Sequence, residues 1–483
     1  MLSAIGKQRT SKVLATAFLL AIALSLWLLY HPDLGSSTHI LRPVHERPAT
    51  IDTSDTASVT ADIVHYFTSH PLGPPYKDVF GELGERCRIL DDWIVLADTT
   101  NDASRRNMLS AAIEKTAAQH FPFLKNPGHL TSKAPLSELR RSFTPGSAGI
   151  VIPTSEGTLR FAAHLVVSLR SVLHSNLPIQ ITYASDNDLS AQSRSYLQSL
   201  VESGPPLEFL DITTVFDDAS LDLQHGSWAI KPFAALASRF ERVILLDADA
   251  VFLQPPEVLF EHGAFRAAGA GALLFHDRLL WQHAFAERHE WWRSQVRRPP
   301  SAALNRSRVW TEDYAEEGDS GAVVVDKSRA DVLVGLLHVC WQNTRAVREE
   351  ATYRMTYGDK ESWWFGLELA GARYEFEEHY AAVVGWLEGE EVCSFVIAHV
   401  DEQDRLLWYN GSLLKNKGRE EMKHEYEVPV YWMVDGEWRK GATKQDMSCM
   451  AKGEPRRLSG DERSILEAMI ERARKIDQGL HLR

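Results

Sequence analysis

Two aspartates separated by one residue, Asp247 and Asp249, form the strongest chemical signal in the chain. They follow the short apolar run 243–246, which is too brief and too β-branched for a helix and predicts a buried strand. Positions i and i+2 of a strand share one face, so both carboxylates can point into one site. Without an obvious cationic neighbour they would repel, unless a hard divalent cation lies between them and a phosphorylated substrate. The spacing therefore predicts a metal–diphosphate site; a plain turn after a strand is the alternative.

The surrounding sequence alternates strands and helices from residue 149 onward. Apolar runs predict strands, and amphipathic stretches predict helices, at the following positions: strands 149–153, 178–183, 207–211 and 243–246; helices 158–174 and 230–240. This β-α-β alternation predicts an α/β fold with a mainly parallel sheet flanked by helices. In such sheets ligands bind at the carboxyl ends of the strands, which is where the aspartates lie. No G-x-G-x-x-G follows the first strand, so the dinucleotide fingerprint is absent.

Composition limits the class of protein and the type of partner. The chain has 483 residues, of which 44% are hydrophobic and 24% charged, as in ordinary globular proteins. The net charge of −13 argues against nucleic acid as a partner, because too little positive charge is present to neutralise its phosphates.

The N-terminus carries a membrane-targeting signal. Three basic residues, Lys7, Arg9 and Lys12, precede the uncharged segment 13–30, whose helix would be roughly 27 Å long, near the thickness of the hydrocarbon core. By the positive-inside rule we expect a single-pass type II anchor, with the N-terminus cytosolic and the bulk of the chain lumenal. A cleaved signal peptide is the alternative. We expect this domain order: cytosolic tail 1–12, transmembrane signal anchor 13–30, stem 31–62, helical extension 63–148, catalytic domain 149–440 and C-terminal helical segment 441–483.

The cysteines and two N-glycosylation sequons are relevant to the expected lumenal location. The four cysteines lack the spacing of a metal site: Cys87, Cys340, Cys393 and Cys449. In an oxidising lumen they could form two disulfides, with three pairings, and free buried thiols are the alternative. Asn305 and Asn410 each begin an N-x-S sequon for N-glycosylation.

Six stretches taken in order resemble one family, the fungal Golgi α-mannosyltransferases that contain the α-1,3- and α-1,2-mannosyltransferases. They are IKPFA at 230–234, FERVILLDAD at 240–249, GALLFHDR at 271–278, GDSGAVVVDK at 318–327, YGDKESWW at 357–364, and HVD at 399–401 with LWYN at 407–410. The resemblance implies a GT-A-like nucleotide-sugar-binding fold, a GDP-mannose donor, a mannosylated glycan acceptor and Mn²⁺ or another divalent cation. It also implies a Golgi membrane location and partners among Golgi glycosyltransferase complexes.

The resemblance also implies roles for the metal and phosphate ligands. Asp247 and Asp249 would hold the cation, and His399, which follows an expected strand, would be the third ligand. A structural histidine is the alternative for His399. Lys231 stands before Pro232 at a helix start, where its ammonium and the free backbone N–H groups could meet phosphate. A solvated lysine is the alternative there.

Further residues are candidates for the sugar and the nucleotide. Asp319, between Gly318 and Gly321, could accept hydrogen bonds from sugar hydroxyls or face the anomeric carbon; the family tends to have Glu-Ser-Gly here, and this chain has Asp-Ser-Gly. Asp359 could hold a sugar hydroxyl and Lys360 could face the diphosphate. We expect Arg170 and Asp186 to contact the nucleotide. Trp363 and Trp364 either belong to the hydrophobic core or stack on a sugar.

The expected reaction retains the configuration of the transferred sugar. It needs either a carboxylate nucleophile, for which Asp319 is the candidate, or front-side attack with the leaving phosphate as base. Two other functions remain open: a haloacid-dehalogenase-like Mg²⁺-dependent phosphatase, and a non-catalytic lumenal glycan-binding protein. The first would need a second downstream acid beyond Asp359, and Ser362 and Trp363 stand near that place instead.

Overall fold

The computed structural model describes residues 53–126, 133–266, 269–443 and 446–480. From Thr53 onward the chain forms one compact unit. The expected tail, the transmembrane anchor and most of the stem lie outside the described residues. Within the described ranges, no helix combines the length and apolar character needed to cross a bilayer.

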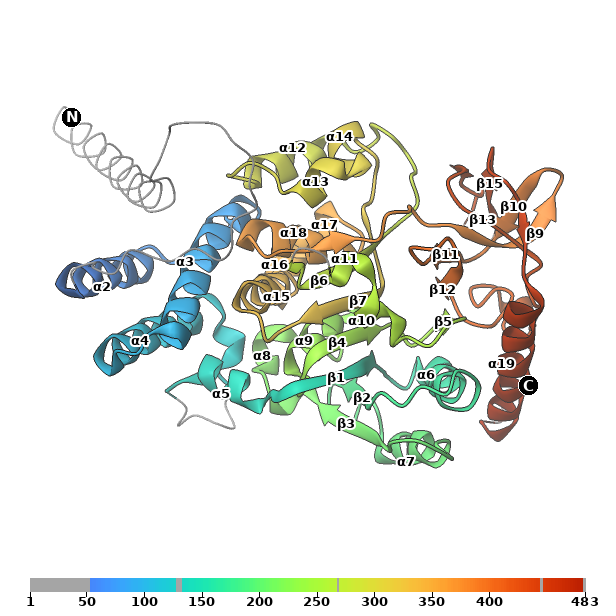
Figure 1. Cartoon of the computed structure of the whole chain (residues 1–483), viewed down its shortest axis with the longest axis horizontal. Helices are drawn as coiled ribbons and strands as arrows, with labels where there is room; N and C mark the ends of the chain where they lie inside the picture. The colour runs from blue at the N-terminus through green and yellow to red at the C-terminus, as the bar shows by residue number, and fades with distance from the viewer. Residues whose placement is uncertain (1–52, 127–132, 267–268, 444–445, 481–483) are drawn as a thin grey trace, which may run out of the picture. The chain divides into compact units, whose positions relative to one another are not determined.

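A seven-stranded sheet forms the centre of this unit (Figure 1). Its spatial order is β3 (Leu207–Asp211), β2 (Ile179–Tyr183), β1 (Thr144–Pro153), β4 (Phe240–Leu246), β7 (Gly318–Asp326), β6 (Ala272–His276) and β8 (Glu375–Phe376). The first four are mutually parallel, as are β6 and β8, whereas β7 is antiparallel to both neighbours. The predicted α/β fold with a mainly parallel sheet is confirmed, with β7 as the exception.

Strand β4 shows how the sheet is covered on both faces. Its residues Val243 and Leu245 belong to one core, and Ile244 and Leu246 to the other, all fully buried. The side chains alternate between faces, and a strand buried on both faces is expected to be a continuous apolar run. Helices α9 (Ile230–Ala237), α15 (Ala330–Gln342) and α18 (Lys360–Ala370) belong to the first core; α6 (Leu159–Val167), α7 (Ala191–Ser199) and α19 (Gly460–Gly479) contribute to the second.

The segment before the sheet is helical, as expected. It comprises α2 (Thr53–Ser69), α3 (Phe80–Thr99), α4 (Ala103–His120) and α5 (Pro135–Ser142). Helix α3 packs against α15 and α18, which joins this extension to the first core (Figure 1). Shorter helices connect the remaining strands: α8 (Asp218–Leu221), α10 (Val258–Glu261), α11 (Gly263–Arg266), α12 (Ala286–Gln295), α13 (Ala302–Arg306), α14 (Arg308–Glu312), α16 (Arg345–Val347) and α17 (Tyr353–Met355).

Two smaller sheets follow in the C-terminal part of the chain. One has the order β14 (Glu437–Arg439), β15 (Ser448–Ala451), β10 (Glu391–Ser394), β9 (Val383–Glu388), β13 (Tyr431–Met433) and β16 (Arg456–Arg457). The other has the order β11 (Ile397–Val400), β12 (Leu406–Asn410) and β5 (Ala250–Phe252). The segment 441–483 is therefore not wholly helical as expected, because β15 and β16 pair with earlier strands before α19 begins. Ser459 and Glu462 form a capping box at the start of α19.

The structure also resolves the cysteine alternatives in part. Cys393 of β10 and Cys449 of β15 form a disulfide, whereas Cys87 and Cys340 are free and buried. One expected disulfide is present, and the other two cysteines follow the alternative of buried thiols.

Candidate functional site

A cleft of about 350 Å³ opens at the carboxyl ends of β1 and β4. Its walls come from the turn after β1, the segment before α9, the residues just after β4 and the loop after β12. The lining residues are Pro153, Thr154, Ser155, Thr158, Phe161, Asp188, Leu223, Gln224, Ser227, Trp228, Ile230, Lys231, Asp247, Ala248, Asp249 and Lys417. The predicted pair Asp247 and Asp249 and the predicted Lys231 therefore all face one cleft of ligand size.

Each aspartate of the pair has a lysine beside it. Asp247 Oδ1 lies 3.0 Å from Lys231 Nζ, and Asp249 Oδ2 forms an ion pair with Lys417. The expectation that the two carboxylates lack a cationic neighbour is thus wrong, because tertiary folding brings these lysines from α9 and from the loop after β12. Burial raises the pKa of Asp247, as does the nearby carboxylate of Asp359, against the opposing effect of Lys231.

Lys231 is the centre of a buried network that joins three elements. Its ammonium donates to Ser320 O at 2.9 Å and to Ser320 Oγ at 2.6 Å on β7, and lies 3.4 Å from Asp359 Oδ2 at the start of α18. Only 4% of the residue is exposed. Burial alone would lower the pKa of Lys231, but the carboxylates of Asp247 and Asp359 outweigh it and raise that pKa. The lysine therefore stays charged, and it fixes Asp359 close to the aspartate pair.

Asp319 and His399 form a second buried unit on the adjoining strands. Asp319 Oδ2 lies 3.0 Å from His399 Nε2, and its Oδ1 accepts from Gly321 N at 2.9 Å and from Asn410 Nδ2 at 3.0 Å. Burial would raise the pKa of Asp319, but the hydrogen bond from His399 and that from the Gly321 N–H lower it. The His399 ring is stacked on Trp408, with ring centroids 4.3 Å apart, and no described residue provides a partner for its buried Nδ1.

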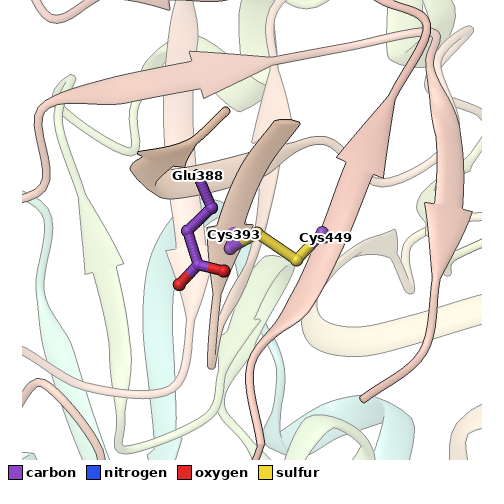
Figure 2. Close-up of side chains that lie close together, drawn as sticks. All are labelled: Glu388, Cys393 and Cys449. Carbon is purple, nitrogen blue, oxygen red and sulfur yellow. A yellow bond between two sulfur atoms is a disulfide. The ribbon is translucent and has the colours of Figure 1, made fainter. Parts of the chain in front are cut away.

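The three predicted metal ligands are not gathered into one cluster. Within the described ranges, the one group of three acidic, histidine or cysteine side chains whose ligand atoms lie within 4.8 Å of one another is Glu388, Cys393 and Cys449. Figure 2 shows Glu388 beside the sulfur–sulfur bond of the other two residues. Because a disulfide offers no thiolate, this group is not a metal site. His399 therefore stays a prediction as the third ligand.

Lys360 lies in a charged cluster away from the aspartate pair. Its ammonium is 2.7 Å from Asp277 Oδ2 and 2.6 Å from Glu316 Oε2. Burial would lower the pKa of Lys360, but these carboxylates raise it well above its ordinary range. The ammonium does not line the cleft; it neutralises two acids beside it.

Two predicted nucleotide contacts lie elsewhere. Arg170 is buried and donates to Ser175 O at 2.7 Å and Pro205 O at 3.2 Å, so its guanidinium fastens loops. Asp186 is exposed and pairs with Arg194 at 2.7 Å. Neither residue lines the cleft, so the structure does not bring either of them to it, and both stay predictions as nucleotide contacts. Asp188, two residues further on, lines it instead, and accepts a hydrogen bond from Ala184 N at 2.9 Å.

Lys417 is the main cleft residue that sequence reasoning missed. It sits in a loop with no motif of its own, and burial lowers the pKa of its ammonium. Its one local signal is a second lysine, Lys415, two positions earlier, which is too weak to single it out. The open alternative for Trp363 and Trp364 is settled by their burial at 1% exposure each: they are core, with indole N–H groups that donate to Asp359 and Glu361.

Comparison with known proteins adds an independent line of similarity. Residues 147–401 match a family described as "Mannosyltransferase putative". The chain is 30% identical over 273 residues to the α-1,3-mannosyltransferase MNT3 of Saccharomyces cerevisiae, covering 49% of this chain and 42% of that protein. It is 27% identical over 314 residues to a protein of Candida albicans named "Putative alpha-1,3-mannosyltransferase MNN14", covering 58% of this chain and 44% of that protein. The matches thus span less than half the length of either relative.

Among solved structures, the bifunctional glycosyltransferase WbbM aligns with a TM-score of 0.32 and 14% identity, over 48% of this chain and 39% of that one. A similarity of this size supports no conclusion about the present chain.

Proposed function

Since the chain belongs to the mannosyltransferase family whose model spans residues 147–401, we propose that it is a metal-dependent retaining glycosyltransferase. The donor is GDP-mannose, the acceptor is an α-mannoside of a glycoprotein glycan, and the product linkage is α-1,3 or α-1,2. The core fold is of the GT-A type. The observation that carries this proposal is the cleft in which Asp247 and Asp249 face Lys231 and Lys417 at the carboxyl ends of β1 and β4.

The cleft suits a nucleoside diphosphate by size and charge. Volumes of a few hundred Å³ are typical of small-molecule sites. Lys417 places a positive charge beside Asp249, where the diphosphate of the donor would lie. Charge-assisted contacts to phosphate are among the stronger polar interactions. Asp188 and the turn at Pro153–Ser155 also line the cleft, and we propose that the nucleoside lies against them.

The residues present fit a hard divalent cation such as Mn²⁺. Asp247 and Asp249 offer carboxylate oxygens open to the cleft. His399 offers Nδ1, a buried atom without a partner in the described chain, but it does not line the cleft and does not cluster with the two aspartates, so it would have to move to complete the set. The other ring nitrogen of His399 is held by Asp319, and metal-ligating histidines are commonly oriented by such a carboxylate. When bound, the cation would neutralise the charge that develops on the leaving diphosphate.

The remaining acidic residues position rather than react. Asp319 has both oxygens engaged by Gly321, Asn410 and His399, so its geometry favours orienting His399 over attacking the sugar. Asp359 is held beside the aspartate pair by Lys231 and by the Trp363 indole, whose Nε1 lies 2.9 Å from Asp359 Oδ2. There it would accept a hydrogen bond from a sugar hydroxyl. This arrangement favours front-side attack, with the leaving phosphate taking the acceptor proton.

The setting of the reaction is part of the proposal. We place the catalytic unit in the Golgi lumen on a type II anchor at 13–30, in complexes with other glycosyltransferases. Support comes from the charge pattern of the N-terminal sequence and from the disulfide between Cys393 and Cys449, which is typical of an oxidising compartment.

Assay of the full-length chain tests the function. Purified protein with GDP-mannose, Mn²⁺ and an α-mannobiose acceptor is expected to yield a trisaccharide that is resolved by chromatography. Asp249→Ala should abolish transfer while the circular dichroism spectrum stays that of the native protein; full activity of this variant would refute the role of the pair. Release of inorganic phosphate from phosphomonoesters would point instead to a phosphatase, and donor binding without turnover to a glycan-binding protein.

A further inference from the structure

Two large aromatic rings are exposed at the rim of the cleft. Trp228, within the short 3₁₀ turn Ser227–Ala229 before α9, is 43% exposed, and Tyr357, just before α18, is 55% exposed. Their ring centroids are 5.3 Å apart and the planes are tilted by 47°. Most tryptophan and tyrosine side chains are largely buried, so a pair that shares contact and still faces solvent needs an explanation.

The backbone holds this pair in place on both sides. Ser227 has a φ of 51° and Gly358 a φ of 67°, both in the left-handed region that favours glycine. A Cβ on Gly358 would lie 2.9 Å from Trp228 Cε3, so the absence of a side chain at 358 lets the indole lie directly over the backbone. The non-glycine residue at a positive φ indicates strain that is retained at this position. The local backbone conformation therefore holds the two exposed rings against each other.

The pair bridges two chemically different surroundings. Trp228 lines the cleft together with Lys231 and Asp247. Tyr357 lies at the charged cluster, with Lys360 Nζ 5.7 Å from its ring centroid, and that ammonium is bonded to Glu316 and Asp277. Aromatic ring faces beside ionised groups are the arrangement that recognises a sugar: the C–H face of a pyranose stacks on an aromatic ring, and its hydroxyls bond to charged groups.

We propose that Trp228 and Tyr357 form the stacking platform for the acceptor, a terminal mannopyranoside, with Glu316 and Lys360 as hydrogen-bond partners for its hydroxyls. The proposal rests on the proposed function and specifies where its second substrate binds. Trp228 lines the cleft and Tyr357, which contacts it, is exposed, so a sugar stacked on this pair would reach the donor from solvent. A glycan on a protein surface can reach only such an open position.

Kinetics of the full-length protein test this placement. Tyr357→Ala and Trp228→Ala should each raise the KM for α-mannobiose about tenfold, which corresponds to the loss of about 1.4 kcal/mol of stacking. Tyr357→Phe keeps the ring and should keep the KM within about twofold. Leu387→Ala, which removes another exposed apolar side chain on β9, is the matched control and should leave the KM unaltered.

The direct alternative is that Trp228 stacks on the nucleobase of the donor. The Kd for GDP, measured by quenching of tryptophan fluorescence in Tyr357→Ala, should equal that of the wild-type protein. An unaltered acceptor KM in Tyr357→Ala, or a rise in the GDP Kd that matches the rise in KM, would overturn the platform.

Failure of the proposed function can be distinguished from failure of the proposed acceptor platform. If the wild-type protein transfers no sugar, saturation-transfer NMR with α-mannobiose still tests the platform: loss of the wild-type signal in Tyr357→Ala supports it. Equal signals from the two proteins, or none from either, would reject it.

Discussion

Single lysines determine the electrostatics of the aspartate pair. Lys231 is buried and bonded to β7 and α18 as well as to Asp247, whereas Lys417 pairs with Asp249 from a loop and is 42% exposed at its side chain. The first lysine is therefore part of the framework, and the second is free to exchange its carboxylate for an arriving phosphate. Their roles should separate experimentally.

Removal of Lys417 tests its role in donor binding. Lys417→Ala should lower kcat/KM for GDP-mannose about 100-fold, as expected when a charged contact to a developing anion is lost. The melting temperature should hardly change, because the lysine lies in a surface loop. Lys423→Ala removes an exposed lysine six positions further along the chain, which pairs with Glu420, and serves as the control. Equal kinetics for both variants would contradict the assignment.

Asp319 offers a test that separates positioning from chemistry. If it orients His399, Asp319→Asn should weaken Mn²⁺ binding about 10- to 100-fold, measured by electron paramagnetic resonance without donor. The exposed Asp186→Asn is a control that should bind Mn²⁺ like the wild-type protein. Unaltered Mn²⁺ affinity together with lost turnover would instead assign the Asp319 carboxylate to the sugar.

The sequence predicted the site residues that lie at the ends of strands and the starts of helices. Asp247, Asp249 and Lys231 could be predicted to converge because strand ends and helix starts have fixed directions. Lys417 and Trp228 could not, because they enter the cleft from loops whose course depends on long-range packing. Arg170 lies in the helical segment before β2, and the sequence alone does not reveal whether a basic side chain there faces the cleft or a neighbouring carbonyl, as it does here.

Strands β10 and β15 illustrate how distant elements are joined. They pair antiparallel with Cys393 opposite Cys449, so that the disulfide closes a loop whose ends are 56 residues apart in sequence. β11 and β12, which carry His399 and Asn410, lie within that loop. The covalent link thus closes the segment of chain that supplies both partners of Asp319, His399 and Asn410.

Loss of this disulfide should destabilise the fold. The double variant Cys393→Ala/Cys449→Ala is expected to lose about 4 kcal/mol of unfolding free energy, the loop-closure value for a loop of this length. Urea denaturation followed by tryptophan fluorescence measures the difference. Cys340→Ala in the same assay measures the effect of replacing a buried free cysteine by alanine, so that this effect can be separated from loss of the disulfide. A double variant as stable as the wild-type protein would show that pairing of β10 and β15 suffices.

The whole molecule rests on two cores separated by the seven-stranded sheet. Apolar periodicity predicted four of the seven strands, β1 to β4, and the helices that precede β2 and β4, because residues buried on both faces give continuous apolar strands. The antiparallel course of β7 was beyond sequence reasoning, since strand direction is set by connections and leaves no trace in side-chain pattern. The same holds for β15 and β16, which are short and pair with partners far away in sequence.

Global stability should depend on one buried acid. Burial raises the pKa of Glu377 from 4.5 to about 7, and no described residue provides a partner for its Oε1. The folded-state pKa is the higher one, so the stabilisation is complete below pH 4.5 and is lost as the pH rises to about 7. Relative to Glu377→Gln, the wild-type protein should lose about 3 kcal/mol across this window.

Thermal unfolding of the two proteins between pH 4.5 and pH 8 measures this difference. Their melting temperatures should agree most closely at the acid end, and the glutamine variant should be the more stable at pH 8. Glu378→Gln, an exposed neighbour, should follow the wild-type curve. A constant gap between Glu377→Gln and wild type at every pH would mean that the acid does not titrate in this range.

Asn410 donates its side-chain amide to Asp319, and a Cβ on Gly321 would lie only 2.6 Å from that nitrogen. The same asparagine begins a sequon, and glycosylation in the secretory pathway attaches the sugar to this nitrogen. The packed amide has no room for a glycan, so a glycan on Asn410 and the hydrogen bond to Asp319 exclude one another. If the chain enters the secretory pathway as proposed, modification of Asn410 before folding would leave Asp319 without this donor.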